Sequence, residues 1–164
     1  HDQEEALSIS DRIVLMNQGI VQQFDMPQNL YLEPVNLFVA KFMGNPIINT
    51  YEMKKEGNVL KGDDFSIDIN LLNKNRFKDE LNEENYVVGI RAEYFELSKN
   101  PLFRVKIEST ELIGKDCILN FYVNGKISKS ITDTHNKITE GEEVGFDIDY
   151  NSIYIFKENG VRVY

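Results

Sequence analysis

The sequence predicts a mainly β protein: a small antiparallel barrel, preceded by a short segment that mixes strands and helices. Two observations support this class. Beyond residue 50, short runs such as 65–69 and 103–107 alternate apolar and polar residues, which is typical of half-buried strands. Glycine and asparagine turns separate these runs, and Asn124-Gly125 is the strongest hairpin signal among them. Many short strands between frequent turns favour an antiparallel barrel.

The first residues predict a helix start followed by a hairpin. Asp2 and Glu5 have the spacing of a capping box, and apolar residues follow them. The run 13–16 predicts a strand, 17–19 predicts a turn, and 20–24 predicts a second strand that pairs back onto the first.

Two short helices are expected next. Pro27 suits the first turn of a helix, so residues 28–32 are predicted to be helical. That helix ends before Pro34, because the residue preceding a proline avoids helical angles. The mostly apolar run 37–43 predicts a second helix, which stops at Gly44.

The change from helical to alternating pattern places a domain boundary directly after these helices, between Gly44 and Asn49. We therefore expect a first unit at 1–46 and a second at 47–164. In the second unit, strands are expected over 51–55, 59–60, 65–69, 86–91, 95–97, 102–113, 117–123, 127–131, 144–149, 153–156 and 161–164. A short helix is expected over 73–81, because Phe77 and Leu81 lie four residues apart.

Composition limits the function classes. The 164 residues suffice for one domain and part of another. The formal net charge of -9 disfavours a nucleic-acid partner, because such binding draws its affinity from clustered Lys and Arg. No apolar run approaches the roughly 20 residues that span a bilayer, and no signal-peptide pattern is present. Cys117 is the single cysteine, so no internal disulfide forms.

Residue types that carry chemistry are sparse. The phosphate-binding pattern G-x-x-x-x-G-K-[ST] does not occur, so we expect no nucleotide site in this chain. Asp147 and Asp149 share a strand face, but two carboxylates fall short of the about six to eight oxygens that calcium takes. His135 has no Cys or His at ligand spacing, and Cys117 lies in an apolar run. No metal site is predicted.

Several aromatic residues admit two interpretations. They either pack the barrel core or form a stacking platform for single strands or sugars. The acidic balance and the lack of interleaved basic residues favour the core. The residues concerned are Phe121, Tyr122, Tyr150, Tyr154 and Phe156.

Longer strings of residues carry a family resemblance. The strings H-D-Q-E-E-A at 1–6, D-R-I-V at 11–14 and F-V-A-K-F-M-G at 38–44 resemble the end of the nucleotide-binding domain of ABC transporter ATPases, in the maltose and glycerol-3-phosphate importer branch. Further on, G-I-R-A-E-Y at 89–94 resembles the importer motif G-I-R-P-E-H, with Ala92 and Tyr94 in place of Pro and His. The resemblance implies the C-terminal part of an importer ATP-binding subunit, with an OB-like regulatory (TOBE) domain as its β-rich body.

The resemblance also implies roles for individual residues. His1 corresponds to the switch histidine, which is catalytic only in the parent chain, where ATP and Mg²⁺ bind. No cofactor is expected in this chain itself. Gly89, Arg91 and Glu93 are the candidate regulatory or interface residues. A plain surface ion pair between Arg91 and Glu93 is the alternative.

Two functions remain open. The resemblance implies a regulatory and dimerisation domain, not itself catalytic, of an ATPase subunit that drives uptake of a sugar or glycerol-3-phosphate-like solute. Its implied partners are a second copy of the chain, membrane permease subunits and a regulatory protein, at the cytoplasmic face of the cell membrane. The alternative is an independent OB-type module that senses a sugar or an oxyanion. A nucleic-acid binder is the least favoured reading.

Overall fold

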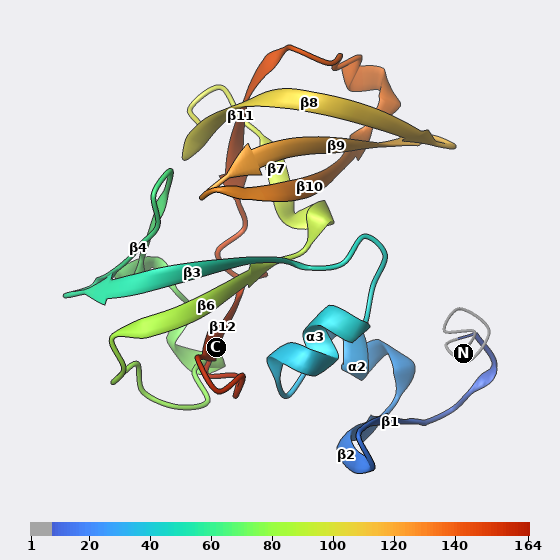
Figure 1. Ribbon diagram of the computed structural model, residues 1–164, viewed down its shortest axis with the longest axis vertical. Helices are drawn as coiled ribbons and strands as arrows, with labels where there is room; N and C mark the ends of the chain where they lie inside the picture. The colour runs from blue at the N-terminus through green and yellow to red at the C-terminus, as the bar shows by residue number, and fades with distance from the viewer. Residues whose placement is uncertain (1–7) are drawn as a thin grey trace.

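A computed structural model describes residues 8–164 (Figure 1). The elements, in chain order, are β1 (Ile13–Asn17), β2 (Ile20–Asp25), α2 (Pro27–Leu32), α3 (Leu37–Phe42), β3 (Asn49–Glu56), β4 (Val59–Lys61), β5 (Ser66–Asp68), η1 (Ile69–Leu71), η2 (Lys74–Arg76), β6 (Asn85–Ile90), η3 (Ala92–Tyr94), β7 (Phe95–Leu97), β8 (Phe103–Ile113), β9 (Asp116–Val123), β10 (Lys126–Asp133), η4 (Thr134–Asn136), β11 (Glu143–Ile148) and β12 (Tyr154–Lys157). Strands dominate this order, so the predicted mainly β class is confirmed.

The first described elements match the sequence prediction. β1 pairs antiparallel with β2 around a turn in which Gly19 has a φ of 79°. α2 begins at Pro27, whose missing N–H would have had no partner inside the helix. α3 begins after Asn36, whose side-chain oxygen accepts a hydrogen bond from the Val39 N–H at 2.9 Å. Local signals alone therefore place these four elements.

The other strands form two five-stranded antiparallel sheets. The strand order is β10-β9-β8-β11-β7 in one and β12-β6-β3-β4-β5 in the other. Figure 1 shows the first sheet above the second, with β10 facing β3. The turn Asn124-Gly125 joins β9 to β10 as predicted, with φ values of 49° and 67° that the tight turn requires.

Aromatic rings from both sheets fill one shared core. The Phe65 ring, beside β5, stacks on Phe103 of β8 with 5.0 Å between centroids. Phe95 lies edge-on to Phe121 and to Phe146, at 5.7 Å in each case. Phe121 is therefore a core residue. A shared core holds the two sheets together as one body.

The prediction of a helix over 73–81 is wrong. Only the short 3₁₀ turn η2 forms there. The Lys78 N–H donates to the Val163 carbonyl at 2.8 Å, and the Glu80 N–H donates to the Asp79 side chain at 2.8 Å. These bonds take backbone donors that a helix needs. Phe77 and Leu81 still pack on the core, which explains their apolar spacing without a helix.

The two helices lie against the lower sheet (Figure 1). Ala40 of α3 is buried in a cluster with Tyr154 and Phe156 of β12. At the other end of the contact, the Leu37 N–H donates to the Gly160 carbonyl at 2.8 Å. Part of the apolar side of α3 is thus covered by the β-rich body, and the junction between helices and sheet is a packed interface.

Candidate functional site

The stretch singled out by the sequence, Gly89, Arg91 and Glu93, lies at this junction. Arg91 follows β6, and only 1% of its surface is exposed. The interpretation of Arg91 and Glu93 as a surface ion pair is therefore wrong: Glu93 is exposed and Arg91 is not. Burying a guanidinium costs free energy unless its N–H groups are hydrogen-bonded, so its partners define the site.

The partners of Arg91 are the ends of the two helices. Its Nη1 donates to the Met43 carbonyl at 2.7 Å, and its Nη2 donates to the Tyr31 carbonyl at 2.6 Å. Met43 is the C-cap of α3, and Tyr31 lies in the last turn of α2. Carbonyls at helix C-termini lack partners within the helix and carry partial negative charge. Arg91 therefore satisfies both helix ends at once.

Tyr31 packs on the same guanidinium. The Arg91 Cζ lies 3.7 Å from the centroid of the Tyr31 ring, and the Tyr31 hydroxyl donates to the Glu93 carboxylate. Burial and the hydrogen bond to Glu93 raise the pKa of the Tyr31 phenol. Arg91 thus contacts the ring of Tyr31, and Glu93 accepts a hydrogen bond from its hydroxyl.

Two glycines permit close packing at the junction, one of them beside Arg91 and Tyr31. A Cβ on Gly44 would lie 2.9 Å from both Arg91 Nη1 and the Tyr31 ring, and its φ is 114°. A Cβ on Gly89 would lie 2.9 Å from Ile48 Cδ1 and 3.2 Å from Phe156. Gly44 was predicted as a helix stop; the structure shows that it also makes room for the arginine.

A second arginine, which sequence reasoning missed, holds the same helix from the other side. Arg162 is 4% exposed, and its Nη1 donates to the Glu33 carboxylate at 2.8 Å and lies 3.4 Å from the Pro34 carbonyl oxygen. Between the two arginines, the Tyr154 hydroxyl donates to the Leu32 carbonyl at 3.2 Å. Three side chains of the β-rich body thus hold the C-terminal end of α2. We call Arg91, Tyr154 and Arg162 the helix clamp.

Charged neighbours lower the pKa of Glu33, the carboxylate that pairs with Arg162 of the helix clamp. Burial alone raises the pKa of Glu33, but the charge of Arg162, its hydrogen bond and the nearby Lys78 outweigh burial and bring that pKa below its ordinary value. Glu33 is therefore held ionised against Arg162. Its side chain is 53% exposed, so this ion pair sits at the edge of the junction.

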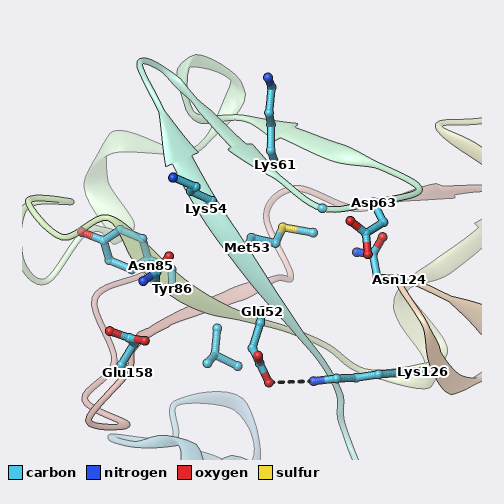
Figure 2. A pocket seen from close by; sticks show the side chains of 12 residues that line it. Glu52, Met53, Lys54, Lys61, Asp63, Asn85, Tyr86, Asn124, Lys126 and Glu158 are labelled. Atoms are coloured by element: carbon cyan, nitrogen blue, oxygen red, sulfur yellow. Dashed lines mark hydrogen bonds and ion pairs between the residues drawn. The ribbon is translucent and has the colours of Figure 1, made fainter.

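A separate cavity of about 660 Å³ lies between the β3–β4 hairpin, β6 and the β9–β10 turn (Figure 2). Lys54, Lys61 and Lys126 line it, together with Glu52, Asp63 and Glu158. Figure 2 shows Lys126 reaching Glu52, at 3.1 Å. Lys54 and Lys61 pair with the neighbouring Glu84 and Glu56, at 2.7 and 2.5 Å. Three lysines and three carboxylates line the cavity, so its lining has no surplus positive charge for an oxyanion.

The other residues considered from the sequence form no site together. Asp147 and Asp149 bind neighbouring backbone N–H groups, at 2.9 Å each. His135 lies in η4 and pairs with Asp133. Cys117 is buried, as expected. Within residues 8–164, no group of three or more His, Cys, Asp or Glu side chains gathers as metal ligands.

The aromatic residues form no exposed platform in the part of the chain that the structure describes. Phe121, Tyr154 and Phe156 are buried and Tyr150 is half-buried, whereas Tyr122 is exposed. His1, and the capping box with it, lie outside the described residues. No helix among residues 8–164 is both long and apolar enough to cross a membrane.

Comparison with known proteins gives relatives along nearly the whole chain. The sn-glycerol-3-phosphate import ATP-binding protein of Psychromonas ingrahamii is 31% identical over 95% of this chain. The trehalose/maltose import ATP-binding protein of Thermococcus litoralis is 30% identical over 100% of it, and the Fe(3+) ions import ATP-binding protein of Fusobacterium nucleatum is 30% identical over 99%. These matches cover 42%, 47% and 44% of the relatives, so the chain spans less than half of their length.

Structure comparison gives a weaker likeness. The cytoplasmic molybdate-binding protein ModG has a TM-score of 0.45 and 13% identity, and the match covers 69% of this chain and 95% of ModG. No family model matches the sequence. These relatives belong to the group of proteins that the strings H-D-Q-E-E-A and G-I-R-A-E-Y resemble. The homologues of this chain are ABC importer ATP-binding subunits, matched over less than half of their own length.

Proposed function

We propose that this chain is the regulatory and dimerisation part of an importer ATPase subunit, and that it acts by holding the end of the ATPase domain against its β-rich body. The helix clamp is the observation that supports this proposal. It joins α2 and α3, which lie in the unit 1–46 that resembles the end of the ATPase domain, to β6 and the residues around β12.

The clamp suits the transmission of rigid-body motion. Arg91 is buried and bonded to the ends of both helices, so α2 and α3 cannot separate from the sheet without leaving a buried charge unpaired. A hydrogen bond to a charged group typically contributes about 1.5–3 kcal/mol. A displacement of the helices during the ATPase cycle therefore moves the β-rich body with them, and the reverse also holds.

The chemistry belongs to the parent protein in this proposal. There, ATP and Mg²⁺ bind upstream of His1, and His1 helps to place the attacking water. This chain itself takes no nucleotide, since it carries no phosphate-binding loop. The parent subunit works at the cytoplasmic face of the membrane with permease subunits, a second copy of itself and a regulatory protein, and it drives uptake of a sugar or glycerol-3-phosphate-like solute.

Two measurements on the chain test this proposal. Sedimentation should show a monomer–dimer equilibrium that shifts with concentration, because the β-rich body supplies dimer contacts. Thermal unfolding with ATP and Mg²⁺ should show no shift in Tm. A strict monomer at high concentration contradicts the dimerisation role, and a saturable rise in Tm with nucleotide contradicts the non-catalytic one.

The alternative, a sugar or oxyanion sensor, would need a ligand site within the β-rich body. The cavity beside Lys54 and Lys126 is the place to look, but its charges are already balanced. Calorimetric titration with maltose, glycerol-3-phosphate and molybdate distinguishes the two functions. Saturable heat with any of them favours the sensor, and its absence favours the regulatory role.

A further inference from the structure

One edge of the upper sheet is open over the end of β10 nearest the β9–β10 turn. β10 is the last strand in the order β10-β9-β8-β11-β7, and Figure 1 shows it as the strand of that sheet that faces β3. Lys126 pairs with Val123 across the two-residue turn, so Lys126, Ser128 and Ser130 direct their backbone groups toward β9. The backbone groups of Ile127, Lys129 and Ile131 then point away from the sheet. Such an edge is a template for an added strand.

One side chain bonds to this edge in the way that a neighbouring strand would. The side-chain amide of Asn49 lies alongside Lys129: its Oδ1 accepts from the Lys129 N–H at 2.8 Å, and its Nδ2 donates to the Lys129 carbonyl at 2.9 Å. This reciprocal pair reproduces the bonding of a neighbouring strand. The next outward-facing residue toward the β9–β10 turn is Ile127, which has no such partner among the described residues. The strand-like pairing therefore ends at Lys129.

A groove runs along this open part of the edge. It has a volume of about 370 Å³ and lies between the segment 45–50 and residues 126–129. Ile47 is 63% exposed on one wall and Ile127 is 61% exposed on the other. Tyr122, directly opposite Ile127 on β9, is exposed as well. The groove therefore offers apolar walls beside free backbone groups, which are the two requirements for recognition by strand addition.

The charges of the groove select its occupant. Lys126 and Lys129 line it, and no Asp or Glu does, in a chain whose net charge is -9. Both lysines have carboxylate partners outside the groove, Glu52 at 3.1 Å and Glu111 at 3.5 Å. These pairs are solvent-exposed and hold the lysines weakly, so an acidic partner competes with them.

A second copy fits this groove poorly. Pairing two β10 edges about a two-fold axis would place the lysines of both copies in one groove, and like charges close together oppose association. An acidic segment in extended conformation removes that conflict. It also matches the spacing of the edge, because alternate residues of a strand point to the same side.

We propose that the groove between residues 45–50 and β10 binds an extended, acidic segment of a partner protein, which adds to the sheet at Ile127 with apolar residues against Ile47 and acidic residues toward Lys126 and Lys129. This inference does not depend on the chain being part of an ATPase. It concerns a binding site between the β-rich body and the segment that leads into it.

The test begins with a library of random decapeptides displayed on phage and selected against the immobilised chain. We expect enriched peptides to alternate acidic residues with Val or Ile. A selected peptide is then titrated against the chain and against Lys126→Glu/Lys129→Glu, which should bind about ten-fold more weakly. Lys99→Glu/Lys106→Glu makes the same change of charge at two exposed sites elsewhere and should bind as the unaltered chain does.

The same peptide, N-methylated at alternate residues, tests the backbone part. One of the two methylation patterns should abolish binding and the other should leave it, because only every second N–H of an added strand faces β10. Three results overturn the proposal: selection of basic peptides, equal binding by both lysine double variants, or equal binding by both methylated peptides. Peptide binding that disappears as the chain dimerises would assign the groove to a second copy instead.

Discussion

The guanidinium of Arg91 lies over the ring of Tyr31, with its Cζ 3.7 Å from the ring centroid, although the two residues are 60 positions apart. The same guanidinium bonds to the backbone carbonyl of Tyr31, and the neighbouring Glu93 accepts from its hydroxyl. Tyr31 is thus bound at three points by a stretch of three residues. The motif that resembles G-I-R-P-E-H serves here as the receptor for the end of a helix.

Replacing Arg91 with Ala should destabilise the chain by about 2–4 kcal/mol, because two hydrogen bonds from a buried charge are lost and two carbonyls are left without partners. Arg91→Lys should recover only part of this, since an ammonium group lacks the planar fork that reaches both carbonyls. Urea unfolding measures both.

The matched control for Arg91 is Arg104→Ala, which removes an exposed arginine from β8 and should change stability by less than about 0.5 kcal/mol. If Arg91→Ala were as stable as Arg104→Ala, the buried guanidinium would not hold the helices.

Tyr31→Phe should cost about 0.5–1.5 kcal/mol, because it removes the hydrogen bond to Glu93 and keeps the ring on Arg91. Tyr31→Ala should cost more, since the ring contact is lost as well. Chemical unfolding gives the two values, and equal losses for Phe and Ala would show that the ring contributes nothing.

Alkaline pH should also weaken the fold. Burial raises the pKa of Tyr31, with its hydrogen bond to Glu93 as the next cause, and burial raises the pKa of Tyr51. A raised pKa means that the folded state favours the neutral phenol. The stabilisation that these two phenols give the folded state is therefore complete below their ordinary pKa of about 10, and it is lost as pH rises above that value. The fall in stability between about pH 10 and 12 should be shallower in Tyr51→Phe. If stability fell with pH as steeply in Tyr51→Phe as in the unaltered chain, Tyr51 would not be a source of the alkaline loss.

Gly89→Ala tests the close approach of β6 to the linker segment. The new Cβ would lie 2.9 Å from Ile48 Cδ1, and overpacking of this kind costs about 1–3 kcal/mol. Ile48→Val removes the Cδ1 atom itself, so the double variant should be more stable than the sum of the two single effects predicts. Strict additivity in a double-mutant cycle would exclude this contact as the cause.

Glu33→Gln tests the ion pair between Glu33 and Arg162 of the helix clamp. The pKa of Glu33 is lowered on folding, so its contribution to stability is present above the unfolded value of about 4.3 and is lost as pH falls through the folded value. The variant should therefore be less stable than the unaltered chain at pH 7, and the difference should shrink toward pH 2. A difference that grows with acid would reverse the assigned sign.

Local signals predicted most of the elements. Pro27, Asn124-Gly125 and the alternation over 65–69 act within a few residues, and the structure has a helix, a hairpin and a strand at these places. The helix predicted over 73–81 failed because backbone donors there bond elsewhere, for example Lys78 to Val163. The prediction considered only side-chain spacing.

The candidate site was predicted only in part. The family motif indicated Arg91 and Glu93, but nothing in the sequence tells whether they face another subunit or the same chain. Arg162 gave no signal, because the alternation of Val161-Arg162-Val163 suggests an exposed polar position. In the structure its partner Glu33 lies 129 positions away. Contacts over such separations depend on how the whole chain folds.

The most direct test of the account uses the complete ATP-binding subunit in a reconstituted importer, carrying Arg91→Lys or the control Arg104→Lys. The account predicts that Arg91→Lys lowers the ratio of solute-stimulated to basal ATP hydrolysis by about five-fold or more while nucleotide affinity stays the same, and that Arg104→Lys changes neither. A stimulation ratio for a folded Arg91→Lys subunit equal to that of the control would contradict the claim that the helix clamp links the β-rich body to the ATPase.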